Sequence, residues 1–112
     1  MATIVIQVSL NATGTGLILN DGQSNGPDIT TNVKNGDIVK WKLIPNSGIA
    51  SIDAIHDTST DVFNPDPAPQ VGNSGIWQGT ISASAGNSET YCIYYTVGTT
   101  QYNQDPKIQV NV

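Results

Sequence analysis

One stretch of the sequence gathers oxygen and nitrogen donors that are able to bind a divalent cation. Asp53 and Asp57 flank the only histidine, His56, and Asp61 follows four residues after Asp57. On a helix, Asp53, Asp57 and Asp61 would share one face. The stretch lacks the spacing of an EF-hand and has no glutamate that could complete a Ca²⁺ shell bidentately. We therefore expect a solvated acidic turn, with Ca²⁺ bound through Asp53, His56, Asp57 and Asp61 as the alternative.

The same histidine and the single cysteine are the residues on which catalysis would depend. A hydrolase that uses His56 needs a nucleophile and an acid beside it, and the sequence singles out neither partner. Cys92 lies inside a tyrosine-rich segment, where a cysteine is typically a small buried hydrophobic residue rather than a reactive thiolate. We predict that the chain is not an enzyme, and we assign no catalytic residue.

A third group of residues has the chemistry of a sugar-binding ledge. Tyr94 is expected on the opposite strand face from the other tyrosines of its segment, and Tyr102 is expected in a loop over residues 98–104. Asn103 and Asp105 follow closely. An aromatic ring can stack on a sugar ring while amides and carboxylates bind its hydroxyl groups. The expected ligand-binding residues are Tyr94, Tyr102, Asn103 and Asp105, with ordinary surface tyrosines and a turn as the alternative.

The composition indicates one small domain and argues against a nucleic-acid partner. The 112 residues are 38% hydrophobic and 12% charged, with a formal net charge of −5, and this length fits a single domain over residues 1–112. The four basic residues are all lysines, so the chain has neither a basic stripe nor an arginine fork for phosphate groups. The single cysteine cannot form a disulfide within the chain.

Alternation of apolar residues with a period of two predicts short strands along the whole chain. It is clearest in residues 4–10, 39–43, 76–83, 90–97 and 108–112, with a shorter run at 16–19. Turn-forming Asn-Gly, Pro-Asn and Gly-Asn pairs separate these runs. Residues 48–56 fit either a short helix or an irregular strand, because their isoleucines recur at about helical spacing. About seven strands without a crossover helix predict an all-β fold, an antiparallel two-sheet Greek-key β-sandwich.

Residues 33–41 read Val-Lys-Asn-Gly-Asp-Ile-Val-Lys-Trp and resemble the cupredoxin pattern in which Gly-Asp precedes a strand that ends in an aromatic residue. Residues 86–97 resemble the tyrosine-rich penultimate strand of that family, and residues 106–110 its closing strand. The resemblance implies a cupredoxin-like fold. A type 1 copper site needs two histidines, a cysteine thiolate and usually an axial methionine. This chain has one histidine and its only methionine is Met1, so the resemblance implies neither copper nor electron transfer.

The segment from Gly36 to Trp41, together with Asp105-Pro106 before the last strand, is also similar to inclusion-body proteins of the AidA and PixA type. In those proteins a tryptophan usually precedes the Asp-Pro pair, and Gln104 takes that place here. This chain is also shorter. Those proteins are not known to be enzymes, so this similarity too implies a non-catalytic role.

The N-terminus begins directly with a strand pattern and shows neither a signal sequence nor a membrane-spanning stretch. We expect a cytoplasmic protein without membrane insertion if Met1 is the native start, and a secreted one if a signal has been removed. Residues 3–10 carry no charge, so we expect this strand to pair internally or across a homodimer. The expected function is a non-catalytic binding or self-associating module, with a small, lectin-like carbohydrate-binding protein assisted by Ca²⁺ as the alternative.

Overall fold

The computed structural model describes residues 2–10, 14, 16–22, 25–26, 29–44, 47–57, 62–64, 66–70 and 73–111. Within these ranges the regular elements are eleven strands. They are β1 (Thr3–Leu10), β2 (Leu17–Asn20), β3 (Asn25–Gly26), β4 (Thr30–Lys34), β5 (Ile38–Leu43), β6 (Ser51–Asp57), β7 (Ala68–Gln70), β8 (Asn73–Thr80), β9 (Ser88–Val97), β10 (Thr100–Gln104) and β11 (Lys107–Asn111). The fold is all-β, and its strands outnumber the seven predicted from alternation. None of the described residues belongs to a helix of the length and apolarity needed to cross a membrane.

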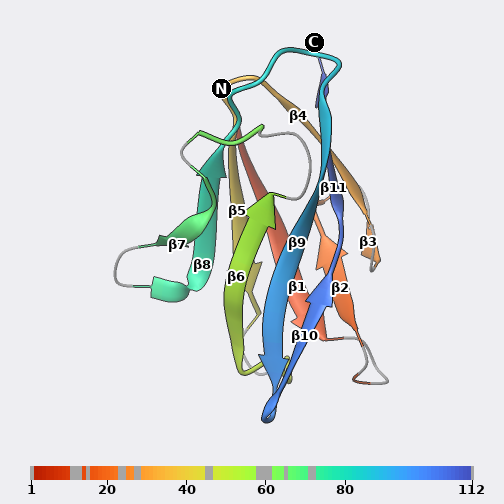
Figure 1. Cartoon of the computed structure of the whole chain (residues 1–112), viewed down its shortest axis with the longest axis vertical. Coiled ribbons are helices and arrows are strands. Elements are labelled where there is room, and N and C mark those ends of the chain that lie inside the picture. The colour runs from red at the N-terminus through yellow and green to blue at the C-terminus, as the bar shows by residue number, and fades with distance from the viewer. Residues whose placement is uncertain are drawn as a thin grey trace.

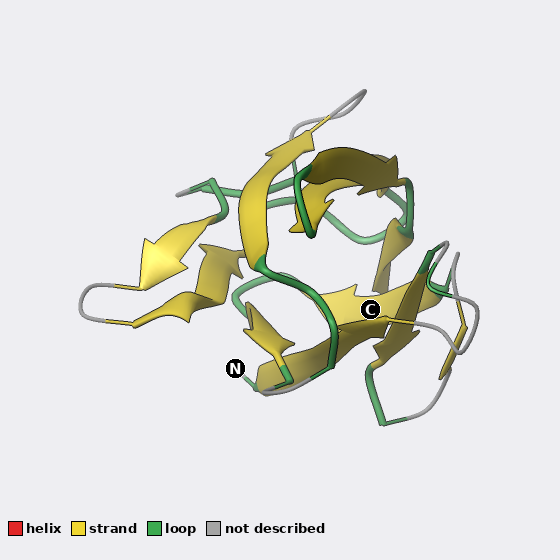
Figure 2. Ribbon diagram, turned by 90° about the horizontal axis from the view of Figure 1, so that it is seen from below, coloured by secondary structure: helices red, strands yellow, loops and turns green. Residues whose placement is uncertain are grey.

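The strands form two packed sheets, which confirms the predicted β-sandwich. One sheet has the order β3-β2-β1-β5-β8-β7. In the other, β9 pairs with β6 along one side and with β10 and then β11 along the other, and β11 also pairs with β4 (Figure 1). Seen along the strands, the sheets form two layers, with the hairpin of β7 and β8 at one side (Figure 2). Both sheets are mixed rather than purely antiparallel, because β1 and β5 are parallel, as are β4 and β11. Alternation gives the buried face of a strand but not its direction, so the sequence pattern could not reveal these parallel pairs.

The uncharged first strand lies in the middle of its sheet. β1 pairs antiparallel with β2 along one edge and parallel with β5 along the other. Its inward side chains Ile6 and Val8 are fully buried. The prediction that this strand pairs internally is therefore confirmed. Because β1 is not an edge strand, it needs no charge to prevent pairing with another chain.

The segment that fitted either a helix or an irregular strand is the bulged strand β6. The register against β9 shifts between Ile52 and Ala54, so this part of β6 has one residue more than its partner. The extra residue lets Ile52 and Ile55 both reach the core, with 6% and 3% of their surface exposed. The bulge thus produces a spacing of three between buried isoleucines, which imitates the period of a helix.

The Gly-Asp-x-x-x-Trp segment has structural roles throughout. Gly36 adopts a φ of 92°, which an L side chain rarely adopts, in the turn between β4 and β5. The carboxylate of Asp37 accepts hydrogen bonds of 2.9 Å from the backbone N–H groups of Ala2 and Lys34. Trp41 is fully buried. The motif closes a turn, fixes the start of β1 and fills the core.

Aromatic side chains from both sheets meet at the centre of the sandwich. The ring centroid of Trp41 on β5 lies 5.4 Å from that of Tyr91 on β9 and 5.6 Å from that of Phe63. These tilted and edge-on arrangements are the favourable ones for aromatic pairs. Trp77 on β8 is 8% exposed and belongs to the same core cluster. Both tryptophans therefore pack in the core, as their positions in the alternation pattern predict.

Candidate functional site

The strands β6, β9 and β10 display a polar face on the outside of the sandwich. The side chains of Tyr91, Ile93 and Tyr95 point into the core, so those of Cys92 and Tyr94 alternate to the outer side. Tyr94 lies directly opposite Ala54 on one neighbouring strand and Asn103 on the other. We call this part of the face the Tyr94 surface and define it by Ala54, His56, Cys92, Tyr94, Asn103 and Asp105.

The Tyr94 side chain is held by two neighbours. The ring of His56 meets it edge-on, with the ring centroids 5.7 Å apart and the planes at 69°. Interaction with the thiol of Cys92 raises the pKa of Tyr94. The phenol is therefore neutral at physiological pH and keeps its O–H group.

The ionisation of Cys92 is influenced by burial and by its neighbours Asp105 and Tyr94. Burial raises the pKa of the Cys92 thiol, and a hydrogen bond to the carboxylate of Asp105 raises it further. The cysteine is buried, as predicted, with 6% of its surface exposed. The protonated thiol is consistent with positioning rather than with nucleophilic chemistry.

Tyr102 lies on the opposite face from the Tyr94 surface. The loop predicted for residues 98–104 is instead a hairpin turn followed by β10, and Tyr102 pairs with the inward-facing Tyr95. The two rings stack with their centroids 5.8 Å apart and their planes at 28°. Neighbouring residues of a strand point to opposite sides. The structure therefore brings Tyr94 and Asn103 together and separates Tyr102 from them, contrary to the single ledge that we expected.

The acidic residues predicted to bind a metal are only partly within the described structure. Asp53 accepts hydrogen bonds from Ser51 Oγ at 2.6 Å, from Gln101 Nε2 at 3.0 Å and from Thr96 Oγ1. These hydrogen bonds lower the pKa of Asp53 and occupy its oxygens. His56 lies further along β6, whereas Asp61 and the side chain of Asp57 fall outside the described residues. In the part of the chain that is described, no three His, Cys, Asp or Glu side chains form a metal-binding group. The Ca²⁺ site stays a prediction.

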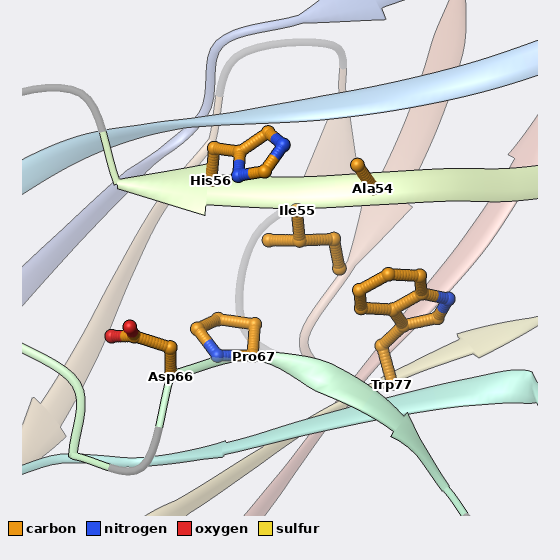
Figure 3. A pocket seen from close by; sticks show the side chains of 6 residues that line it. All are labelled: Ala54, Ile55, His56, Asp66, Pro67 and Trp77. Carbon is orange, nitrogen blue, oxygen red and sulfur yellow. The ribbon is translucent and has the colours of Figure 1, made fainter.

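A cavity of about 420 Å³ opens beside the Tyr94 surface, between β6 and the β7–β8 hairpin. Its lining residues are Ala54, Ile55, His56, Asp66, Pro67 and Trp77. Figure 3 shows His56 and Asp66 toward one end and Trp77 at the other, with Ile55 between them. Ala54 and His56 belong to both the cavity lining and the Tyr94 surface.

Comparison with known protein families gives a match that spans most of the strands. A domain of unknown function (DUF8788) matches residues 15–102, more than three quarters of the chain. The chain belongs to that family. Its DUF8788 region includes His56, Cys92 and Tyr94 but ends before Asn103 and Asp105. No curated protein matches the sequence of this DUF8788 domain.

Sequence reasoning missed the small and polar residues that complete the surface. Ala54 reaches it only because β6 pairs with β9, and one strand pattern does not name its partners. The available signal was the alternation within β9, which places Cys92, Tyr94 and Thr96 on one face. That signal identified Tyr94 and would also have identified Cys92 as its neighbour.

Proposed function

We propose that this domain is a non-catalytic binding module that recognises a carbohydrate on the Tyr94 surface. The observation that carries the proposal is the position of Tyr94 between Ala54 and Asn103. The methyl group of Ala54 is too small to cover the neighbouring aromatic ring. The amide of Asn103 supplies both donors and an acceptor for sugar hydroxyl groups next to that ring.

The fixed geometry of the tyrosine supports this proposal. The contacts of Tyr94 with His56 and Cys92 restrict its side chain before any ligand arrives. A group that is already ordered loses less conformational entropy on binding, so a rigid aromatic ring contributes more to affinity. Asp105 interacts with the same thiol and adds a carboxylate acceptor.

The ionisation of Cys92 supports a role without catalysis. The thiolate, not the thiol, is the nucleophilic form of cysteine. Burial and the hydrogen bond to Asp105 both raise the pKa of Cys92, so the thiol form predominates at neutral pH.

A glycan-array screen of the purified domain tests the proposal, run once with Ca²⁺ and once with a chelator. We expect saturable binding to a defined sugar, and we expect Tyr94→Ala to abolish it. Tyr102→Ala is the matched control, because it removes the same type of ring from the opposite face of the neighbouring strand. That variant should bind a free, monovalent sugar with the affinity of the unmodified domain.

The outcomes separate the ligand from the cation. Loss of sugar binding in chelator would assign a cation to the site, and Asp53 and His56 would be the first residues to substitute. Binding that survives both the chelator and Tyr94→Ala would place the sugar elsewhere. If protein shown to be folded binds no sugar on the array, this result would contradict the carbohydrate proposal.

A further inference from the structure

The edge strands of the two sheets differ in how they are protected against pairing with another chain. An unpaired strand edge is a template for an additional strand, and proteins usually protect it by shortness, proline, charge or a bulge. β3 has two residues, and the three-residue β7 contains Pro69. β4 ends in the exposed Lys34, and β6 carries Asp53, His56 and a bulge. Each of these four edges has at least one of the usual protections.

β10 has none of these protections. Its sequence, Thr-Gln-Tyr-Asn-Gln, contains no charge and no proline, and its five residues pair with β9 without a register shift. Four of its five residues are exposed, and Tyr102 is a large aromatic residue with 40% of its surface exposed. Among the described strands, β9 is the one with which β10 pairs (Figure 1). No strand within the described ranges pairs with the other edge of β10.

The hairpin defines which backbone groups point outward from this edge. The turn between β9 and β10 consists of Gly98 and Thr99, and Val97 pairs with Thr100. In a two-residue hairpin the residues that flank the turn form a hydrogen-bonded pair, and such pairs alternate with non-hydrogen-bonded ones along the ladder. Tyr102 therefore bonds to β9, whereas Gln101 and Asn103 direct their N–H and C=O groups away from it.

We propose that β10 pairs antiparallel with β10 of a second copy of this chain, about a two-fold axis at Tyr102. In that register Gln101 of each copy faces Asn103 of the other, and these are the residues with outward backbone groups. Each such pair exchanges both of its backbone hydrogen bonds, so the two pairs contribute roughly four. No charged residue of β10 opposes another, because the strand has none.

The same register covers the exposed tyrosine. Tyr102 of one copy faces Tyr102 of the other as a non-hydrogen-bonded pair, in which Cα atoms lie about 4.5 Å apart and side chains are closest. Each ring already stacks on Tyr95 of its own chain, with centroids 5.8 Å apart. Pairing therefore joins two stacked tyrosine pairs and removes exposed aromatic surface from water.

The pairing makes one continuous sheet from both copies, with both Tyr94 surfaces on the same side. Neighbouring strands lie about 4.8 Å apart, so three spacings place the two copies of β9 roughly 14 Å from each other. This consequence rests on the proposed function: a polymer with repeating sugars would then contact both surfaces and gain avidity. The dimer itself does not require any ligand.

Sedimentation equilibrium of the full chain without ligand, from micromolar to millimolar concentrations, tests the pairing. We expect a reversible monomer–dimer equilibrium, since a two-strand contact is small. Gln101→Pro removes an outward N–H without breaking the ladder to β9, and we expect it to lower the association constant at least about tenfold. Gln101→Ala is the matched control, because it loses the same side-chain bond to Asp53 but keeps the N–H, and it should still dimerise.

Oxidative cross-linking tests the register. Tyr102→Cys places two thiols at the two-fold axis, within the distance that a disulfide spans, so we expect a covalent dimer. Gln104→Cys lies on the same face but pairs with Thr100 of the other copy, and it should remain largely uncross-linked. A strict monomer at every concentration would overturn the proposal, and so would unchanged dimerisation of a folded Gln101→Pro variant. Because no sugar is present, these outcomes are independent of the glycan-array result.

Discussion

The indole Nε1 of Trp41 donates a hydrogen bond of 3.1 Å to the hydroxyl oxygen of Tyr91, between two side chains that are fully buried. Trp41 belongs to β5 and Tyr91 to β9, so the bond connects the two sheets through the core. Buried polar groups without a partner are costly, and this pair satisfies two of them at once.

Replacing Tyr91 by phenylalanine should destabilise the fold. The ring stays in the core, but the N–H of Trp41 loses its acceptor, which costs about 1–3 kcal/mol. Urea denaturation followed by tryptophan fluorescence measures the change in the free energy of unfolding. Tyr102→Phe is the control, because its hydroxyl belongs to a side chain with 40% exposure. Equal denaturation midpoints for Tyr91→Phe and the unmodified chain would contradict the prediction.

Stability should fall at alkaline pH. Burial is the main cause that raises the pKa of Tyr91, and it also raises the pKa of Cys92. In the unfolded chain a thiol ionises near pH ~8.5 and a phenol near pH ~10. The stabilisation is fully present below those values and is lost as the pH rises toward the higher pKa values of the folded state. We expect the free energy of unfolding to decrease steadily above about pH 8.5, and Tyr91→Phe to make the decrease shallower above about pH 10. A flat profile would contradict this.

The ionisation of Asp53 should affect the stability of the fold at acidic pH. Hydrogen bonds from Ser51, Thr96 and Gln101 lower the pKa of Asp53, in that order of importance. Its stabilisation is therefore present above the unfolded pKa of about 3.9 and is lost as the pH falls through the lower folded value. The effect is small because the carboxylate is exposed to solvent. An NMR titration should show Asp53 ionising below the normal range, and Gln101→Ala should move that ionisation upward. A normal titration in the unmodified chain would contradict the prediction.

The sequence predicted which side of a strand faces the core better than it predicted which strands pair and in which direction. Alternation identified the inward side of β1, β5, β9 and β11, because a sheet with one buried face requires it. It could not show that β1 runs parallel to β5, since strand direction depends on connections across the sandwich. The bulge in β6 was visible only as an ambiguous isoleucine spacing.

In the candidate site too, the sequence predicted the strand face of a residue better than its neighbours in space. Tyr94 was correctly placed on the outer face of its strand, whereas Tyr102 was expected beside it because the segment after Gly98 was interpreted as a loop. A two-residue turn converts that segment into a strand, and its alternation then separates Tyr102 from Asn103. The influence of Tyr94 and Asp105 on the ionisation of Cys92 depends on side chains that come together only in the folded state.

Gly79 provides a test of how tightly β8 packs against the side chains of Phe63 and Pro67. A Cβ atom at this position would lie 2.9 Å from Cδ1 of Phe63 and 3.3 Å from Cγ of Pro67. The glycine is buried on the inward face of β8, and its φ lies outside the positive range that side chains avoid. Gly79→Ala should therefore destabilise the fold through overpacking, by about 1–3 kcal/mol.

A double-mutant cycle separates overpacking from other effects of this substitution. Phe63→Leu removes the ring atoms that the new methyl group would meet, so the double variant should lose less stability than the sum of the two single variants. Chemical denaturation of all four proteins gives the coupling free energy, which we expect to be at least about 0.5 kcal/mol. Strict additivity would mean that Phe63 does not limit the side chain at position 79. The destabilisation caused by Gly79→Ala would then need a cause other than the contact with Phe63.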